Sequence, residues 1–407
     1  MKIVKTKDGR SYLYPFILVT SLFFLWGFAH SILDVLNKDF QIVFQMTKAK
    51  SALVQMMVYG GYFLMALPAG YITKKMGYRK GVIIGLLIYA FGAFLFIPGC
   101  KLESFPFFLL CLFIIGCGLT CLETAANPYV TVLGDPKYGS SRLNFAQAFN
   151  GFGWMCGPLA GSLIILSDSK NIDNLAIPYM GIGIVVLVVA LLFVCAKLPE
   201  IKEEKEDKEE RGSKDDDTNN SLWQHPHFIF GLFALFLYVA AQTGINSFFI
   251  NYATESTISF SPKEAGLLLS FGGMGLFMIG RFLGSWLLSL IKASTLLFIF
   301  SIGAFCCMIL VIVNVGWVSL IALFICYFFE SIMFPTIFSM SIRNLGKDTK
   351  RASSFLIMSI VGGAIAPWLM GLIGEESINI GFIIPFLCFT IIGIFAYKYP
   401  QLIAKTK

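Results

Sequence analysis

Residues 105–133 read FPFFLLCLFIIGCGLTCLETAANPYVTVL, and this stretch decides the class of protein. It is long and apolar enough to cross a bilayer as a helix, yet it carries the carboxylate of Glu123 in its interior. An ionisable group at that depth is costly unless it is paired, protonated or in contact with water. Asn127 lies one turn further on the same helical face, and Pro128 interrupts the backbone hydrogen bonds and predicts a bend. The stretch therefore predicts a membrane-spanning helix that contains a functional polar site.

The whole chain has the composition of a helical membrane protein. Its 407 residues are 57% hydrophobic and only 14% charged, whereas a soluble domain carries about 25% charged residues. The net charge of +7 comes from basic residues scattered over short loops, so we expect no nucleic-acid partner. The ten cysteines lie almost entirely in apolar segments without metal-type spacing, which favours a packing role.

The apolar runs predict an all-α membrane protein with twelve transmembrane helices. A charged, low-complexity linker at 198–224 separates six spans from six. We expect an N-terminal half over 15–197, a C-terminal half over 225–398 and cytoplasmic tails over 1–14 and 399–407. The expected spans are 15–38, 50–74, 80–99, 105–133, 141–167, 177–197, 225–251, 263–290, 293–313, 315–341, 351–373 and 380–398.

The distribution of basic residues predicts the orientation of the chain. Most of the 31 Lys and Arg residues fall in the tails and loops that share a side with both termini. By the positive-inside rule, that side is cytoplasmic. The opposite side receives only Lys38, Lys48, Lys50, Lys101, Lys170 and Lys263.

The two halves repeat each other in sequence. Glu123 precedes Pro128 by five residues in the fourth span, and Glu330 precedes Pro335 by five in the tenth. Arginine–proline and glycine–glycine pairs recur at nearly the same offset, about half the chain. The pattern predicts two pseudo-symmetric six-helix halves, which in such transporters rock about a substrate site near the midplane.

The first span carries a polar face. Trp26, His30 and Asp34 recur every four residues, with Ser31 alongside. We expect Asp34 to line a water-filled cavity, where it binds protons or sugar hydroxyls; the alternative is an acid that reaches the membrane surface beside Lys38. A packing role explains His30 as well as ligand contact does, and Trp26 suits either sugar stacking or a lipid-interface anchor.

Amide side chains complete the predicted cavity. Gln242 is the half-chain counterpart of Asp34, so the second half carries an amide where the first carries an acid. Glu330 mirrors Glu123 but is crowded by phenylalanines, so its role stays open. The remaining candidate substrate-binding residues are Asn127, Asn144, Gln147, Asn150, Tyr238 and Asn246.

Acids and amides together can hydrogen-bond several hydroxyls in fixed directions. An acid can also hold a proton in one state and release it when water reaches it, so Glu123 and Asp34 are the predicted proton-coupling residues. The sequence contains no ATP-binding phosphate loop, no hydrolase nucleophile motif and no zinc-protease motif. We therefore expect a carrier and not an enzyme, with no cofactor and no metal.

Four stretches carry a family resemblance. They are SLFFLW at 21–26 with Asp34 eight residues on, LETAANP at 122–128, RLNFAQAFN at 142–150 and SSF at 353–355. They are similar to the fucose–galactose–glucose:proton symporter family of the major facilitator superfamily. The resemblance extends over essentially all spans and leaves out the linker.

The resemblance implies an alternating-access carrier that takes up a neutral monosaccharide together with a proton. It implies that Glu123 is the main protonation site and that Asp34 couples protonation to sugar recognition. Gln147 and Asn150 match sugar-binding residues of the family, and Trp26 matches its first-span tryptophan. The implied location is the cytoplasmic (inner) membrane of a bacterium, in a monomer without an obligate protein partner.

The departures from the family pattern concern the sugar. His30 and Ser31 stand where fucose-transporting members have asparagines, whereas Gln242 matches the amide of those members. We expect L-fucose first, with glucose, galactose or another hexose as the alternative. A non-transporting sugar sensor and a drug exporter are less favoured, because the chain lacks a signalling domain and its amide stripes do not suit an apolar pocket.

Overall fold

The computed structural model describes residues 4, 12–134, 139–166, 176–196, 222–256, 258–288, 290–345 and 349–404. Within these ranges the regular structure is entirely helical. Most of the expected linker at 198–224 falls outside the described residues. The side chains of Asn144 and Arg351 are also outside them.

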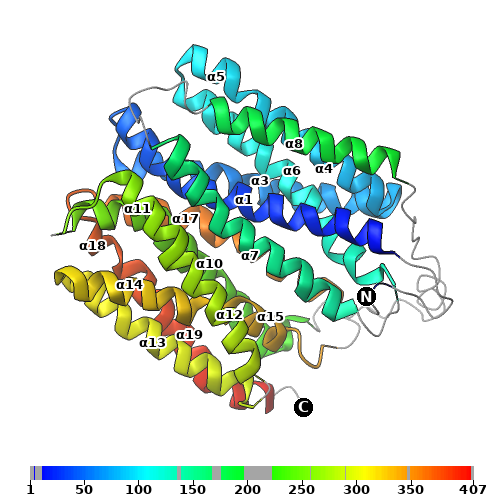
Figure 1. Cartoon of the computed structure of the whole chain (residues 1–407). Helices are drawn as coiled ribbons and strands as arrows, with labels where there is room; N and C mark the ends of the chain where they lie inside the picture. Colours follow the sequence, from blue (N-terminus) through cyan, green and yellow to red (C-terminus); the bar gives the residue numbers. More distant parts are fainter. Residues whose placement is uncertain are drawn as a thin grey trace.

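In the described residues, the first half comprises eight helices (Figure 1), most of them long. They are α1 (Leu13–Val43), α2 (Lys48–Ser51), α3 (Leu53–Met76), α4 (Tyr78–Phe94), α5 (Phe96–Leu102), α6 (Phe105–Val132), α7 (Gly139–Ile164) and α8 (Ala176–Cys195).

The second half is more interrupted. Its elements are η4 (Leu222–Gln224), α10 (Pro226–Glu255), α11 (Pro262–Leu268), the π-helical turn η5 (Leu269–Met274), α12 (Gly275–Leu287), α13 (Ala293–Val313), α14 (Gly316–Glu330), α15 (Met333–Ser341), α16 (Thr349–Met358), η7 (Ser359–Val361), α17 (Gly362–Ile373), α18 (Ile378–Gly381) and α19 (Ile383–Ala404).

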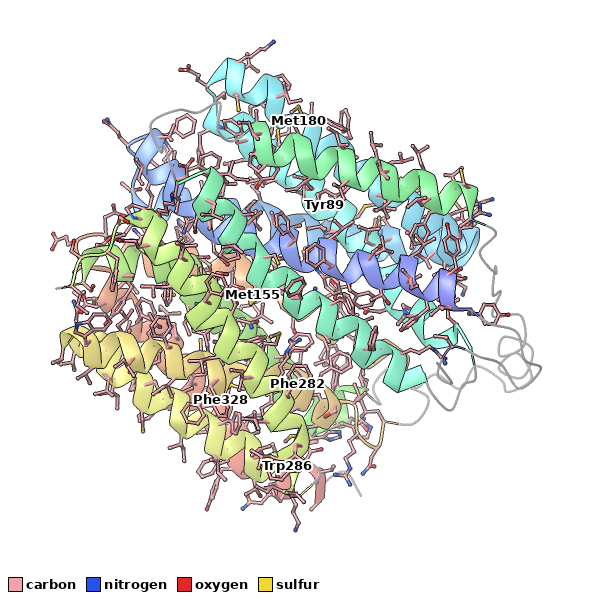
Figure 2. The ribbon with its side chains drawn as sticks, in the orientation of Figure 1. Tyr89, Met155, Met180, Phe282, Trp286 and Phe328 are labelled. Atoms are coloured by element: carbon pink, nitrogen blue, oxygen red, sulfur yellow. The ribbon has the colours of Figure 1, made fainter. Side chains whose placement is uncertain are left out.

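The predicted twelve-helix architecture is confirmed. Eleven segments of the described chain are long and apolar enough to cross a membrane. The twelfth crossing is α7, which has 26 residues but is more polar, because it carries the amide stripe. Large apolar side chains cover the outside of the bundle, as lipid contact requires; Phe282 and Trp286 of α12 are 63% and 60% exposed (Figure 2).

Several helices extend beyond their expected ends, and α1 and α19 extend by the most residues. The first span was expected to end at residue 38, but α1 continues to Val43, because Asn37 and Gln41 are held there by bonds to the second half. The last span was expected to end at 398, but α19 continues to Ala404. A helix whose backbone bonds are internal need not stop at the edge of the hydrocarbon.

The two repeated prolines act differently. α6 runs without interruption through Pro128, so the repeat does not produce a break there. In the second half the helix stops at Glu330 and restarts at Met333. Pro335 has no N–H to bond the carbonyl of Ser331, and Arg281 Nε lies 3.4 Å from that carbonyl oxygen as its donor.

The halves lie side by side, with α1 and α7 of the first facing α10 and α11 of the second, and with α17 of the second packed against α2 and α3 of the first (Figure 1). The start of α1 and the end of α19 lie toward the same end of the bundle. We call this the proximal end, and we call the end where α1 and α10 finish the distal end.

Candidate functional site

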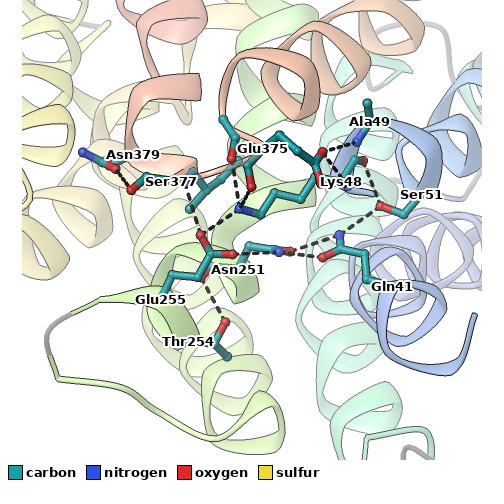
Figure 3. A network of polar contacts seen from close by, with 12 residues as sticks. Gln41, Lys48, Ala49, Ser51, Asn251, Thr254, Glu255, Glu375, Ser377 and Asn379 are labelled. Carbon is teal, nitrogen blue, oxygen red and sulfur yellow. Dashed lines mark hydrogen bonds and ion pairs between the residues drawn. The ribbon is translucent and has the colours of Figure 1, made fainter. Parts of the chain in front are cut away.

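An ion pair joins the two halves at the distal end (Figure 3). Lys48 Nζ, on α2 of the first half, lies 2.9 Å from Glu255 Oε2 at the end of α10. The same ammonium donates to the carbonyls of Gly374 and Glu375, each at 2.9 Å. The Lys48 side chain is only 10% exposed, so these acceptors satisfy a nearly buried charge, as burial requires.

Amide pairs extend this contact into the bundle. Gln41 and Asn251 exchange two side-chain hydrogen bonds, at 2.7 and 3.3 Å. Asn37 Nδ2 donates to the carbonyl of Ser247 at 2.8 Å. Each pair joins α1 to α10, so the first helix of one half is bonded along its distal part to the first helix of the other.

Two further bonds cross between the halves nearer the midplane. Thr243 Oγ1 donates to the hydroxyl of Tyr59 at 3.2 Å. Ser270 Oγ donates to the carbonyl of Met155 at 2.7 Å, and Figure 2 shows Met155 where α7 borders the second half. All of these crossing bonds lie in the distal half of their helices, so the halves are joined at the distal end.

Glycine permits backbone atoms of the two halves to lie close together at this junction. A Cβ atom on Gly371 of α17 would lie 2.6 Å from the backbone nitrogen of Ala49. Backbone atoms cannot rotate out of the way, so α17 and α2 can pack at this distance only with glycine at 371.

Asp34 is a buried acid with one bonded oxygen. It is 2% exposed, and Gln55 Nε2 of α3 donates to its Oδ1 at 3.0 Å. Its Oδ2 has no hydrogen-bond partner among the described residues. This burial and this bond argue against the alternative of an acid at the membrane surface beside Lys38, whose charged neighbours are Glu255 and Lys48.

His30 lies in an aromatic cluster. Its Nε2 shares a hydrogen bond of 3.0 Å with the hydroxyl of Tyr62. The rings of Tyr59 and Trp154 lie 5.7 and 6.0 Å from it, and the half-buried Trp26 meets it edge-on at 6.4 Å. Packing and polar bonding therefore both account for His30 in this conformation.

Glu123 of α6 is half-buried and faces the same cluster. The side chain of Tyr62 interacts with it and with Trp26. One turn further on, the Oδ1 atom of Asn127 is buried and has no partner in the described part of the chain. Tyr62 of α3 thus connects Trp26 and His30 of α1 with Glu123 of α6.

The side chains of Asn150 and Ser31 are buried and bonded to backbone carbonyls, whereas that of Gln147 is partly accessible. Asn150 is 6% exposed and its Nδ2 donates to the carbonyl of Phe23 at 3.1 Å, which joins α7 to α1. Ser31 is fully buried and donates to the carbonyl of Gly27 at 3.0 Å, so in this conformation its hydroxyl proton is not available to a sugar. Gln147 is half-buried.

The second half contributes Tyr238, Gln242 and Asn246 along α10. Gln242 is half-buried. The hydroxyl of Tyr238 and the Oδ1 of Asn246 are buried and have no partner among the residues described. Buried polar atoms in proteins nearly always have a hydrogen-bond partner, which can be a water or a ligand. These side chains can therefore still form a hydrogen bond with a bound molecule.

Three contributors were missed by the sequence reasoning. Gln55, Tyr59 and Tyr62 bond to Asp34, Thr243 and His30. Their spacing of four and three residues puts them on one face of α3, and this spacing was visible in the sequence. No group of three or more His, Cys, Asp or Glu side chains able to hold a metal occurs in the described ranges.

Comparison with known proteins gives a consistent result. The sequence profile of the Major Facilitator Superfamily matches residues 16–367. The chain is 40% identical over 412 residues to the L-fucose-proton symporter of Escherichia coli, covering 96% of this chain and 94% of that protein. It is 33% identical to the glucose/galactose transporter of Brucella abortus, covering 96% and 95%.

A solved structure covers the same range. The crystal structure of a Major Facilitator Superfamily transporter, FucP, in the outward conformation has a TM-score of 0.71 and 39% sequence identity to this chain. The similarity covers 96% of this chain and 99% of that one.

Proposed function

The chain belongs to the Major Facilitator Superfamily, and on that premise we propose that it imports a neutral monosaccharide, L-fucose first, together with a proton. The similarity to the L-fucose-proton symporter extends over nearly the whole chain. The observation that carries the proposal is the surroundings of the two acids in the first half. Asp34 and Glu123 have Gln55 and Tyr62 as partners, and no lysine or arginine pairs with either acid in the described part of the chain.

Proton coupling follows from this arrangement. A carboxyl group inside a membrane protein that has no cation nearby is stabilised by binding a proton. If it releases that proton and no water reaches it, the resulting carboxylate has a high free energy. We assign the transported proton to Glu123, and we assign to Asp34 the link between protonation and sugar recognition. Gln147 and Gln242, half-buried on facing halves, supply amide groups for the sugar hydroxyls.

Alternating access follows from the distal junction. With the termini placed in the cytoplasm by the positive-inside rule, the distal end faces outward and this conformation is closed to the outside. The similar FucP structure was solved in the outward conformation. Release of the bonds of Lys48 and Gln41 across the distal end is then the step that admits sugar from outside.

The driving force is large enough for uptake against a gradient. One pH unit contributes about 1.4 kcal/mol per proton, and 100 mV contributes about 2.3 kcal/mol per charge. Together they support a concentration ratio above about a hundredfold, since about 1.4 kcal/mol corresponds to tenfold.

A glucose or galactose transporter is the second candidate. It is favoured by the similarity to the Brucella abortus protein and by His30 and Ser31 in the first span. We place the protein in the inner membrane of a bacterium as a monomer, with lipid, sugar and proton as its partners.

Counterflow of labelled sugar in proteoliposomes tests the function. Vesicles preloaded with unlabelled L-fucose are expected to accumulate labelled L-fucose transiently, and the same assay with glucose and galactose ranks the candidates. Failure of every hexose and deoxyhexose to exchange would exclude sugar transport and leave the sensor or exporter.

A further inference from the structure

Glu330 is the most deeply buried acid that the mechanism above does not use. It is the last residue of α14, where the tenth span breaks. It is fully buried, and neither carboxyl oxygen has a hydrogen-bond partner among the described residues. Asp34, by comparison, has one oxygen bonded to Gln55.

The groups around Glu330 come from three helices. Tyr238 of α10 and Tyr327 of α14 lie within electrostatic range of it, and both tyrosine hydroxyls are themselves without a partner in the described ranges. Arg281 of α12 also lies within electrostatic range of Tyr238. Tyr238 therefore interacts with both the acid and an arginine.

The remaining neighbours add no charge. Cys326 on α14 lies within range of Glu330, and Cys307 of α13 lies next to Cys326. The segments η5 and α15, which also pack against α14, carry no titratable residue. The tyrosines extend the group toward the first half, because Tyr59 lies within range of Tyr238 and Asp34 within range of Tyr327.

Burial without any donor among the described residues disfavours a charge on Glu330 in this conformation. An ionised carboxylate in such a site lacks the compensation that burial demands. Arg281 does not provide it here, since its Nε is directed at the carbonyl of Ser331 and its guanidinium lies 4.8 Å from the ring of Phe277. Burial therefore favours the uncharged, protonated form of Glu330 in this conformation.

We propose that Glu330 is a second proton-binding site of the carrier, with Arg281 as the cation that receives its charge. The inference rests on the proposed symport. The proton binds with the sugar from the distal side and leaves to water on the proximal side. The carboxylate that remains then pairs with Arg281, which weakens the bond of Arg281 to the break between α14 and α15.

The test is the number of protons coupled to each sugar. In proteoliposomes with an imposed pH gradient, the sugar ratio at which net uptake stops rises tenfold per pH unit for each coupled proton. Glu330→Gln is expected to lower that ratio about tenfold at one pH unit, while counterflow without a gradient continues. Glu103→Gln, on an exposed acid, is the matched control and is expected to leave the ratio unchanged.

Infrared difference spectroscopy provides a second, transport-free measurement. Wild-type protein is expected to show the band of a protonated carboxylic acid that is missing in Glu330→Gln and shifted in Glu330→Asp. If the glutamine variant fails to fold, a shift of the carboxylic acid band in Glu330→Asp still shows whether residue 330 carries the proton. An unchanged stopping ratio, or the absence of a band assignable to residue 330, would overturn the proposal. Loss of counterflow in the wild type would instead overturn the symport itself.

Discussion

Tyr62 is the residue on which the polar site of the first half depends. Its hydroxyl bonds His30 at 3.0 Å, and its side chain interacts with Glu123 and Trp26. Tyr62→Phe keeps the ring and removes these contacts, each worth about 0.5–1.5 kcal/mol. We expect uptake of L-fucose to fall roughly three- to tenfold at subsaturating sugar. Tyr71→Phe, on an exposed tyrosine of the same helix, is the control, and equal rates in the two variants would remove Tyr62 from the site.

Glu123 carries the proton in the proposed mechanism, so its neutral mimic separates coupling from transport. Glu123→Gln keeps the size of the side chain and cannot release a proton. We expect uphill accumulation to fall to the ratio that the proton at Glu330 supports, and to be abolished when Glu330→Gln is added, while counterflow of sugar survives. Proton-driven accumulation at the wild-type level in this variant would show that another group carries the proton.

Gln55 provides the only hydrogen bond to Asp34 that the structure shows. In Gln55→Leu the Oδ1 atom of Asp34 loses its donor, which leaves both carboxyl oxygens without one, and a buried unpaired polar atom costs about 1–3 kcal/mol. We expect a lower free energy of unfolding and weaker sugar binding, measured by thermal unfolding with and without L-fucose. Gln55→Glu, which keeps a polar side chain, is expected to recover part of the stability at low pH only. Wild-type behaviour of Gln55→Leu would mean that Asp34 does not rely on this bond.

The sequence predicted acids more readily than their partners. Asp34 and Glu123 were identified because a carboxylate in an apolar span seldom has a role in packing alone and therefore indicates a functional site. Tyr59 and Tyr62 were missed because a tyrosine in a membrane helix is also an ordinary packing residue. Ser31 was included because it neighbours His30, but its side chain is directed at α7 and bonds the backbone.

At the scale of helices, the repeated Glu–Pro spacing indicated the part of the tenth span where the helix is interrupted. It did not indicate that the fourth span stays continuous at the matching position. α6 continues through Pro128, whereas α14 ends at Glu330. A side-chain donor, Arg281, is present in the second half to bond the carbonyl that Pro335 frees. Such a donor comes from a neighbouring helix, so the sequence of one span cannot reveal it.

A substitution at Gly371 tests whether the closed distal end depends on the close contact between α17 and α2. A Cβ atom there would lie 2.6 Å from the backbone of Ala49 across the two halves. Gly371→Ala is therefore expected to disfavour only the distally closed conformation and to slow sugar exchange by about tenfold. Gly181→Ala, where a Cβ atom would meet nothing within 4 Å, is the control. Exchange at the wild-type rate in Gly371→Ala would show that the halves do not approach this closely during transport.

At the scale of the whole molecule, Lys48 holds the two halves together at the distal end. Lys48→Ala removes the donor to Glu255 and to two carbonyls, which we expect to shift the population toward the distally open form by roughly tenfold. The distance between spin labels at Gln45 and Glu376, both exposed, reports that shift. Labels attached through unnatural amino acids avoid the ten native cysteines.

Lys50→Ala is the matched control for this prediction. Lys50 lies on the same four-residue helix α2 but is exposed, and its removal is expected to leave the label distances unchanged. Identical distance distributions in Lys48→Ala and Lys50→Ala would rule out the ion pair as the element that keeps the distal end closed.

The architecture was predictable from composition and the internal repeat, but the conformation was not. Twelve apolar runs and a half-chain offset suffice for two six-helix halves. The same sequence must support both an open and a closed distal end, so no pattern in it favours one of them. The bonds of Lys48, Gln41 and Asn37 across the halves appear only in the structure.

The central claim is that sugar and proton cross together. The most direct measurement is the external pH of a weakly buffered suspension of proteoliposomes when L-fucose is added without any imposed gradient. Sugar entry is expected to draw protons in and raise the external pH, and the variant that carries both Glu123→Gln and Glu330→Gln is expected to give no such change. Entry of labelled L-fucose into wild-type vesicles without any pH change would contradict proton coupling.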